Sequence, residues 1–354
     1  MNENTIHGGV KWQSPSNIAL VKYWGKRPGM TQIPQNPSIS LTLSRCHTET
    51  AIFFEESDRF GLHFRFDGKE NPEFQTKIAD FLKTQMPRFP FLNRMDLHID
   101  SHNSFPHSSG IASSASSMSA LVLCLLDINM SLRGAELCGA TRQSIIDFSE
   151  ASRLSRLASG SACRSLFPKA ALWGATTACQ GSSDEYAVSL ENTIAPVFKT
   201  LHDSILIVSD AKKAVSSRAG HALMDTNPYA TTRYAQANSN IIDLLNALKT
   251  GDLEQFIHIT ESEAMQLHAL MMCSNPSFIL MKPNTLRIIN TIHEFRHETG
   301  IPLCFTLDAG PNVHLLYPDQ HAEMVERFIM DELEHYCHEG QWIPDRVGDG
   351  PSRC

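Results

Sequence analysis

The amino-acid sequence predicts an α+β fold of two domains, and three observations lead to it. Runs with the two-residue period of a half-buried strand are concentrated near the beginning of the chain. Strands and helices then follow one another irregularly, without the strict alternation of a doubly wound parallel sheet. The 354 residues also exceed what one hydrophobic core usually organises, so we place a boundary near residue 200, between domains 1–200 and 201–354.

The first hundred residues are mainly β. Residues 12–43 alternate short apolar runs with Pro, Asn and Gly, and Ser38–Leu43 has the strand period. Residues 48–66 hold two β-prone runs around a polar turn, which predicts a hairpin. A helix over 74–85, with its apolar residues on one face, and a strand over Met95–Asp100 are expected next.

The rest of the chain is richer in helix. A loop of small residues at 106–117 runs directly into the apolar segment Met118–Ile128, which predicts a buried helix. The other expected elements are helices over 134–157 and 229–271, the latter interrupted at 250–252, and strands over 170–174 and Ser204–Val208.

The charge balance excludes some classes of partner. Lys and Arg number 30 against 38 Asp and Glu, and this net charge of -8 argues against general binding to nucleic acid or to an anionic membrane. Residues 1–12 lack the features of a secretory signal, and no apolar run approaches the roughly 18 residues of a membrane span. The nine cysteines are never spaced C-x-x-C, which favours reduced thiols in the cytoplasm.

The small-residue loop before Met118 could bind phosphate. Backbone N–H groups at a helix N-terminus are unpaired and carry partial positive charge, and small residues let a phosphate approach them closely. Gly110, Ser113 and Ser114 suit the phosphates of a nucleotide, although the loop is not a Walker A motif. A flexible linker or a close helix-packing surface is the alternative.

Three further segments combine cations with apolar or hydroxyl residues and could hold an anion. They are 17–27, with Tyr23 and Trp24 beside three cations, 155–165, with Gly160 and Arg164, and 212–220, with Arg218. Cations next to apolar walls bind phosphate strongly, and arginine offers a fork for carboxylates. Taken singly, each segment could instead be a solvated strand end, helix end or loop.

An acid at the end of an apolar run is a candidate catalytic group. Asp308 follows Phe305–Leu307 and precedes a Gly-Pro turn. Partial burial of a charged carboxylate is costly unless a cation pairs with it or a proton neutralises it, and carboxylates in such surroundings are frequent at functional sites. The alternative is that Asp308 only caps its turn.

One motif suggests a zinc hydrolase. His293-Glu-Phe-Arg-His297 matches the H-E-x-x-H pattern of such enzymes. The apolar face of this expected helix is formed by the isoleucines and phenylalanine between 288 and 295, so both histidines should face water. We therefore assign no metal-ligating residues, and a hydrolase using His293, Glu294 and His297 stays an alternative.

Six motifs occur in a fixed order along the chain. They are Pro15–Lys26, Ser38–Leu43, Gly110–Ser114, Ser159–Ser165, Ser216–Arg218 and Asp308–Asn312. In this order they resemble the diphosphomevalonate decarboxylase family of the GHMP kinase superfamily. The resemblance implies an N-terminal domain like the second domain of ribosomal protein S5, a ferredoxin-like C-terminal domain, ATP and Mg²⁺, and usually a homodimer.

The implied reaction converts (R)-5-diphosphomevalonate and ATP to isopentenyl diphosphate, ADP, phosphate and CO₂. The resemblance implies that Asp308 faces the tertiary hydroxyl, that Lys22 lies beside it, and that Arg164 grips the carboxylate. The diphosphate end would be held by Tyr23, Lys26, Ser159, Gly160, Ser161, Ser217 and Arg218, and the ATP phosphates by Gly110, Ile111, Ala112, Ser113 and Ser114. A phosphomevalonate decarboxylase or mevalonate 3-kinase of the same family, or a non-catalytic anion-binding module, stays an alternative.

Overall fold

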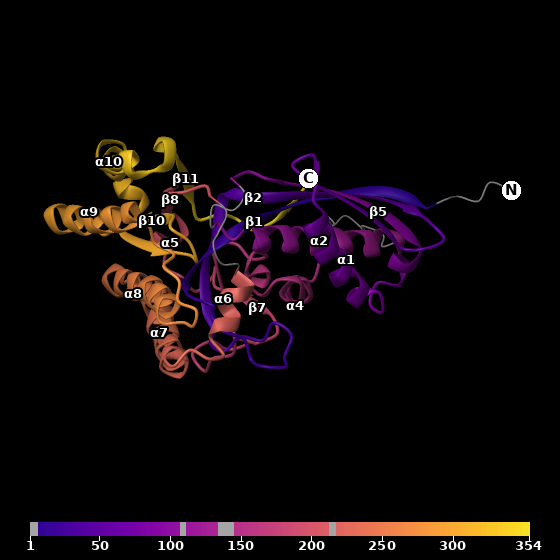
Figure 1. Cartoon of the computed structure of the whole chain (residues 1–354), viewed down its shortest axis with the longest axis horizontal. Helices are drawn as coiled ribbons and strands as arrows, with labels where there is room; N and C mark the ends of the chain where they lie inside the picture. The colour runs from indigo at the N-terminus through magenta and orange to yellow at the C-terminus, as the bar shows by residue number, and fades with distance from the viewer. Residues whose placement is uncertain (1–5, 107–110, 134–144, 212–216) are drawn as a thin grey trace.

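The computed structural model describes residues 6–106, 111–133, 145–211 and 217–354, and it confirms the α+β class. Two sheets lie side by side along the longest axis of the molecule, each with helices packed on it (Figure 1). The larger sheet has eight strands, almost all from the first 200 residues, and the smaller has four strands from the rest of the chain.

The larger sheet has the order β12-β1-β2-β5-β3-β4, with β6 paired to β2 and β7 to β6. Its strands are β1 (His7–Val21), β2 (Ser38–Glu56), β3 (Gly61–Phe66), β4 (Lys69–Glu70), β5 (Met95–Asn103), β6 (Ala170–Trp173), β7 (Ala187–Ser189) and β12 (Ser352–Arg353). The strand predicted at Ser38–Leu43 continues without a break through β2. The strand predicted at Met95–Asp100 is confirmed as β5, in which buried residues alternate with more exposed ones.

The hairpin predicted over 48–66 is wrong. β2 and β3 are consecutive in the sequence, but β5 lies between them, antiparallel to β2 and parallel to β3. The chain passes from β3 to β5 through α1 (Pro72–Gln85), which confirms the helix expected over 74–85. A period of two shows which residues face the core, but it does not show which strand lies alongside. With β5 inserted, its Leu97 and Ile99 occupy the core of this layer.

Three helices cover one face of the larger sheet, namely α1, α2 (Ser113–Leu132) and α4 (Phe148–Ala158). α2 confirms the buried helix expected after the small-residue loop. It is also long and apolar enough to cross a membrane by length and composition, which corrects our expectation that no such run exists. Because 67% of its apolar stretch is buried inside the protein, α2 is explained as a core helix. Of the helix expected over 134–157, residues 134–144 lie outside the described residues.

The smaller sheet has the order β11-β8-β10-β9 and is antiparallel. Its strands are β8 (His202–Leu206), β9 (Cys304–Leu307), β10 (Val313–Tyr317) and β11 (Trp342–Arg346). Successive residues point to opposite faces, so Ile205 packs with α7 and α8 while Leu206 packs with α9 and α10. The strand expected at Ser204–Val208 begins and ends two residues earlier than predicted.

The helices of this half are α5 (Pro196–Lys199), α6 (Ser217–Leu223), α7 (Ala230–Thr250), α8 (Leu253–Met272), α9 (Pro283–Thr299) and α10 (Ala322–Phe328). Shorter helical turns are η1 (Pro90–Arg94), η2 (Gly160–Arg164), η3 (Asp319–His321), η4 (Ile329–Leu333), η5 (Glu334–Tyr336) and η6 (His338–Gly340). The break expected at 250–252 separates α7 from α8. Gly251 adopts a φ of 83°, and Asp252 caps α8 by accepting from the Gln255 N–H.

The two halves share a core and a carboxylate clamp. Ile18 and Leu20 of β1 belong to the same apolar cluster as Ile241 of α7. Asp345 of β11 is 2% exposed and accepts from three successive backbone N–H groups of β2, those of residues 44–46, at 2.9, 2.7 and 2.7 Å. These contacts fix how the two halves meet.

The last strand returns to the first sheet. Ser352 and Arg353 of β12 pair with Gln13 and Trp12 of β1, and Figure 1 marks the C-terminus close to β2. The Nε atom of Arg353 and the indole nitrogen of Trp12 both donate to Asp127 of α2, at 2.7 and 3.0 Å. These contacts attach the C-terminal strand to β1 and α2 of the first half.

Candidate active site

A cleft of about 900 Å³ opens where the two halves meet, and residues of both line it. The first half contributes the end of β1, α1, the beginning of α2, the end of α4 and η2. The second half contributes α6, α8 and the turn after β9. The cleft therefore brings together segments that lie up to about 290 residues apart in the sequence.

Lys22 and Asp308 face each other in this cleft. Lys22 directly follows β1 and Asp308 directly follows β9, so a strand end holds each of them. Lys22 Nζ lies 3.4 Å from Asp308 Oδ1, and the two side chains are 3% and 24% exposed. Burial lowers the pKa of Lys22, while the neighbouring Asp308 carboxylate opposes this shift by favouring the ammonium. The lysine is enclosed, whereas the carboxylate is accessible from the cleft.

Behind Lys22 lies a buried network that sequence reasoning missed. Glu263 of α8 is 0% exposed and accepts from the Lys22 backbone N–H at 2.9 Å. It also accepts from Arg233 Nη2 at 2.5 Å and from Asn240 Nδ2 at 2.6 Å, both on α7. The three side chains lie on the buried faces of their helices, and polar residues at such positions were the available signal. Together they anchor the backbone of Lys22.

A second missed residue is His268 of α8, which is 1% exposed. Its Nε2 atom donates to the backbone carbonyl of Asp308 at 3.1 Å. Burial lowers the pKa of His268 to about 4, so the imidazole is neutral near pH 7. A neutral histidine thus holds the backbone of Asp308, while Lys22 contacts its carboxylate.

Arg164 is buried at the end of η2 and presents a fixed cation to the cleft. Its Nη1, Nε and Nη2 atoms donate to Ser38 Oγ, Ser40 Oγ and Asn17 Oδ1, at 2.6, 3.0 and 3.3 Å. Its guanidinium also lies 5.8 Å from the ring centroid of Trp173. Burial lowers the pKa of Arg164 from its ordinary value. Since these three acceptors are neutral, they orient the guanidinium without cancelling its charge.

An aromatic wall lies next to Arg164. Tyr23 contacts Trp173 edge to face with ring centroids 4.6 Å apart, and its ring lies 4.3 Å from that of His221. Gly160 packs against this wall. A Cβ atom at this position would lie only 2.9 Å from the side chains of Trp173 and Tyr23, so a larger residue would not fit there. His221 accepts from the Gly25 N–H through Nδ1, and burial lowers its pKa to about 3. His221 is a third residue of the site that the sequence analysis did not assign.

The residues expected to bind phosphate divide into three groups. Lys26, Ser159 and Ser161 line the cleft together with Ala112 and Ser114 of the nucleotide loop. Ile111 is buried in the core, and the Ser113 side chain is not part of the cleft wall. Gly110 lies outside the described residues, as do the side chains of Ser217 and Arg218, although both residues belong to the first turn of α6.

The H-E-x-x-H motif lies elsewhere, on α9. The His293 side chain is 45% exposed and its Nε2 atom lies 3.3 Å from Glu261 Oε2, and His297 is also exposed. Both histidines face solvent, as the sequence predicts. Glu261 also forms an ion pair with Arg296 at 2.6 Å, so the surroundings of His293 are those of a surface salt-bridge cluster.

Comparisons with known proteins identify the family of the chain. Residues 14–187 match the family model of the diphosphomevalonate decarboxylase-like N-terminal domain. Residues 204–347 match that of the mevalonate 5-diphosphate decarboxylase C-terminal domain. The diphosphomevalonate decarboxylase of Candida albicans is 31% identical over 352 residues, covering 96% of this chain and 91% of that protein.

Solved structures of this kind superpose over almost the whole chain. The mevalonate diphosphate decarboxylase of Staphylococcus aureus has a TM-score of 0.83 and 26% identity, covering 99% of this chain and 98% of its own. A complex of MDDEF with MVAPP, AMPPCP and magnesium has a TM-score of 0.81 and 28% identity, covering 99% of both chains.

Proposed function

Because the chain belongs to the diphosphomevalonate decarboxylase family, we propose that its cleft performs the ATP-dependent decarboxylation of (R)-5-diphosphomevalonate to isopentenyl diphosphate. The observation that carries this proposal is the convergence of Asp308, Lys22 and Arg164 on one cleft. An accessible acid and two enclosed cations suit a substrate that has a hydroxyl, a carboxylate and a diphosphate.

Asp308 acts on the tertiary hydroxyl. The hydroxyl oxygen attacks the γ-phosphorus of ATP, ADP leaves, and the carboxylate orients the alcohol and accepts its proton. Hydroxide is a poor leaving group, whereas the phosphate formed in this way departs readily. Positive charge then develops at the tertiary carbon, and a carboxylate nearby stabilises it. The electrons of the bond to the substrate carboxylate form the new double bond, and CO₂ is released.

Arg164 holds that carboxylate in position. Its three neutral hydrogen-bond acceptors fix the direction of the guanidinium before substrate arrives. This preorganisation contributes through geometry, because an arginine that bound the ground-state carboxylate too tightly would slow the loss of CO₂. Lys22 and His268 position Asp308, one at the carboxylate and the other at the backbone carbonyl.

ATP binds with its phosphates at the N-terminus of α2. No side chain of the described residues caps this 20-residue helix, so the N–H groups at its start are available to an anion beside Ala112 and Ser114. Phe74, Phe81 and Met118 form an apolar wall of the same cleft that suits a nucleotide base. The described residues fit Mg²⁺ that arrives with ATP, because Asp308 and the hydroxyls of Ser114 and Ser159 offer oxygen ligands. Bound there, Mg²⁺ would neutralise phosphate charge.

The diphosphate of the substrate binds in the part of the same cleft that Tyr23 and η2 line. Lys26, Ser159 and Ser161 line the cleft there, and Gly160 lets the aromatic wall approach the backbone. Tyr23 closes this side, and its hydroxyl donates to Gln32 Oε1 at 3.3 Å. We assign Ser217 and Arg218 to the same group from the family motif.

Three broader properties belong to the same proposal. The division into domains 1–200 and 201–354 is supported by the two sheets, although β12 joins the first sheet from the far end of the chain. Homodimer formation follows from the family resemblance. A cytoplasmic location is supported by the described cysteines, all of which are free thiols.

One assay tests the proposed function. Purified protein is incubated with ATP, Mg²⁺ and either mono- or diphosphomevalonate, and CO₂ and ADP are followed together. Equal amounts of CO₂ and ADP from diphosphomevalonate support the proposal. ADP without CO₂ indicates a kinase, turnover of the monophosphate alone indicates a phosphomevalonate decarboxylase, and no turnover of either indicates a binding module.

A further inference from the structure

The face of the larger sheet opposite α1 and α2 carries two histidines and an acid. His63 of β3 and His98 of β5 are direct partners in the parallel register of these strands. Asp96 precedes His98 by two residues, so it lies on the same face, while Leu97 between them points into the core. The three side chains are 64%, 50% and 25% exposed, in the order His63, His98 and Asp96.

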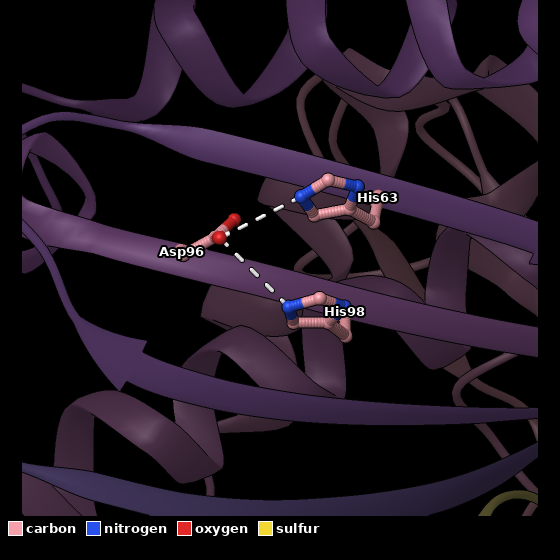
Figure 2. Close-up of side chains that lie close together, drawn as sticks. All are labelled: His63, Asp96 and His98. Carbon is pink, nitrogen blue, oxygen red and sulfur yellow. Dashed lines mark ion pairs between the residues drawn. The ribbon is translucent and has the colours of Figure 1, made fainter.

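The potential ligand atoms converge. Figure 2 shows both imidazoles turning one nitrogen toward the same oxygen of Asp96. The distances from His63 Nε2 and His98 Nε2 to Asp96 Oδ2 are 3.6 and 3.8 Å, and the three atoms all lie within 4.8 Å of one another. These distances exceed a normal hydrogen bond. They approach the separation of about 3.3–3.4 Å between two ligands that each lie about 2.0–2.1 Å from one tetrahedral zinc ion.

The neighbouring groups hold this arrangement before any ion binds. The two imidazole rings stack with centroids 4.5 Å apart and planes at 12°, and Figure 2 shows their Nε2 atoms on the same side. Gly61 is the register partner of Asp96, and a Cβ atom at Gly61 would lie 2.3 Å from Asp96 Oδ1. The missing side chain thus leaves room for the carboxylate to lie over β3. Oδ1 is buried against β3 without a hydrogen bond to any described residue, and Oδ2 points to the histidines.

We propose that His63, Asp96 and His98 form a surface site for Zn²⁺ or another divalent transition metal that links β3 to β5. Imidazole nitrogens with one carboxylate suit zinc, cobalt, nickel or copper, whereas Mg²⁺ prefers an all-oxygen environment. Water would complete the coordination. The site lies on the face of the sheet that does not contact α1, so it is separate from the magnesium that accompanies ATP.

A metal here would fasten the edge of the sheet. Within the described part of the chain, β3 pairs with β5 on one side and only with the two-residue strand β4 on the other. An ion that binds the folded sheet and not the unfolded chain raises the midpoint of thermal unfolding with its concentration.

The test uses the full chain after removal of metals with EDTA. Calorimetric titration with ZnCl₂ should show one site in the wild type, and millimolar MgCl₂ should not compete. His63→Ala or His98→Ala should weaken this binding by about 10- to 100-fold or more, because even loss of a residue that only orients a metal ligand typically costs that much. Cobalt(II) should give the visible absorption of a tetrahedral site, and Zn²⁺ should raise the melting temperature of the wild type but not of these two variants.

Matched controls separate this site from adventitious binding. His102→Ala removes another exposed histidine of β5, one that contacts Asp67, and should leave the titration unchanged. The double change of His293 and His297 to Ala tests the H-E-x-x-H motif in the same way. Gly61→Ala should displace Asp96 and weaken zinc binding with all ligands present. Absence of zinc binding to the wild type, or equal binding by His63→Ala, His98→Ala and wild type, would overturn the proposal.

Discussion

His268 and Asp308 are joined by a hydrogen bond from the imidazole to the main chain, at 3.1 Å from Nε2 to the carbonyl oxygen. Lys22 Nζ contacts the side-chain carboxylate of Asp308, so Asp308 is held both at its main chain and at its side chain. Since the carboxylate remains 24% exposed, the support leaves one side open to substrate. An acid at a loop position thereby gains the fixed geometry that proton transfer requires.

Replacing Asp308 by Asn should lower kcat by about 10²- to 10⁴-fold, the usual contribution of a positioned general base. Loss of charge stabilisation should move the effect toward the upper end. KM should change little, because the charge acts during the reaction rather than on the bound ground state. Steady-state kinetics with CO₂ and ADP measured together would check this result.

Asp331→Asn is the matched control for Asp308→Asn, because Asp331 is exposed and lies outside the cleft. It should behave as wild type. A near-normal kcat for Asp308→Asn would mean that Asp308 only ends its strand, and the anion-binding residues alone would then support the proposed function.

Replacing Lys26 by Ala should weaken binding of diphosphomevalonate by about 10- to 150-fold, as loss of a charge-assisted hydrogen bond of roughly 1.5–3 kcal/mol predicts. The monophosphate should lose less, since it lacks the terminal phosphate. Arg218→Ala should give the same pattern. The measurement is the dissociation constant of each variant for both ligands. An equal loss of affinity for the mono- and the diphosphate would mean that Lys26 does not bind the terminal phosphate.

Acid should destabilise the protein through His268. Its pKa falls from an ordinary value of 6.5 to about 4 on folding, because burial disfavours the imidazolium. Between these values the unfolded chain binds more protons than the folded one, so stability is fully present above pH 6.5 and is lost as the pH falls toward 4. The shift corresponds to about 3 kcal/mol. Denaturant titrations at pH 7.5, 6, 5 and 4.5 would measure the loss.

His268→Gln keeps a side-chain donor for the Asp308 carbonyl but cannot titrate, so its stability should depend less on pH over this range. His258→Gln is the control, since His258 is exposed on the same helix. If His268→Gln and the wild type lost stability in parallel, another group would be responsible. His221, whose pKa is lowered to about 3, would be the next residue to examine.

Replacing Asp345 by Ala should lower stability by about 3 kcal/mol, because three backbone N–H groups of β2 lose a charged acceptor. The midpoint of thermal unfolding would report this change. Asp349→Ala removes an 88% exposed carboxylate from the same segment and should stay within about 0.5 kcal/mol of wild type. Equal melting temperatures for the two variants would contradict the conclusion that the Asp345 carboxylate stabilises the contact between the two halves.

Local motifs predict the residues at the centre of the candidate site, but they do not predict the residues that support them through long-range packing. Lys22, Arg164 and Asp308 stand in short segments whose residue types already indicate anion binding or acid–base chemistry. Glu263 and His268 act through backbone atoms of residues 22 and 308, and nothing in α8 itself indicates those partners. The same limit explains the incorrect hairpin, because strand order depends on how α1 carries the chain past β3. Local motifs also could not predict that His63 lies close to Asp96, because the two residues meet only through the pairing of β3 with β5.

The return of β12 to β1 has a consequence for the order of events during synthesis. A ribosome releases His7–Val21 early, yet Trp12, which pairs with Thr50 on one side, has Arg353 as its partner on the other, more than three hundred residues later. Asp345, which holds residues 44–46, is also made late. The nascent first half can therefore collapse around α2 and pair β1 with β2, but the outer edge of β1 at Trp12 and Gln13 and the backbone N–H groups of residues 44–46 lack their partners until translation is nearly over. A fragment ending near residue 200 would keep that unfinished edge permanently, which makes it prone to self-association.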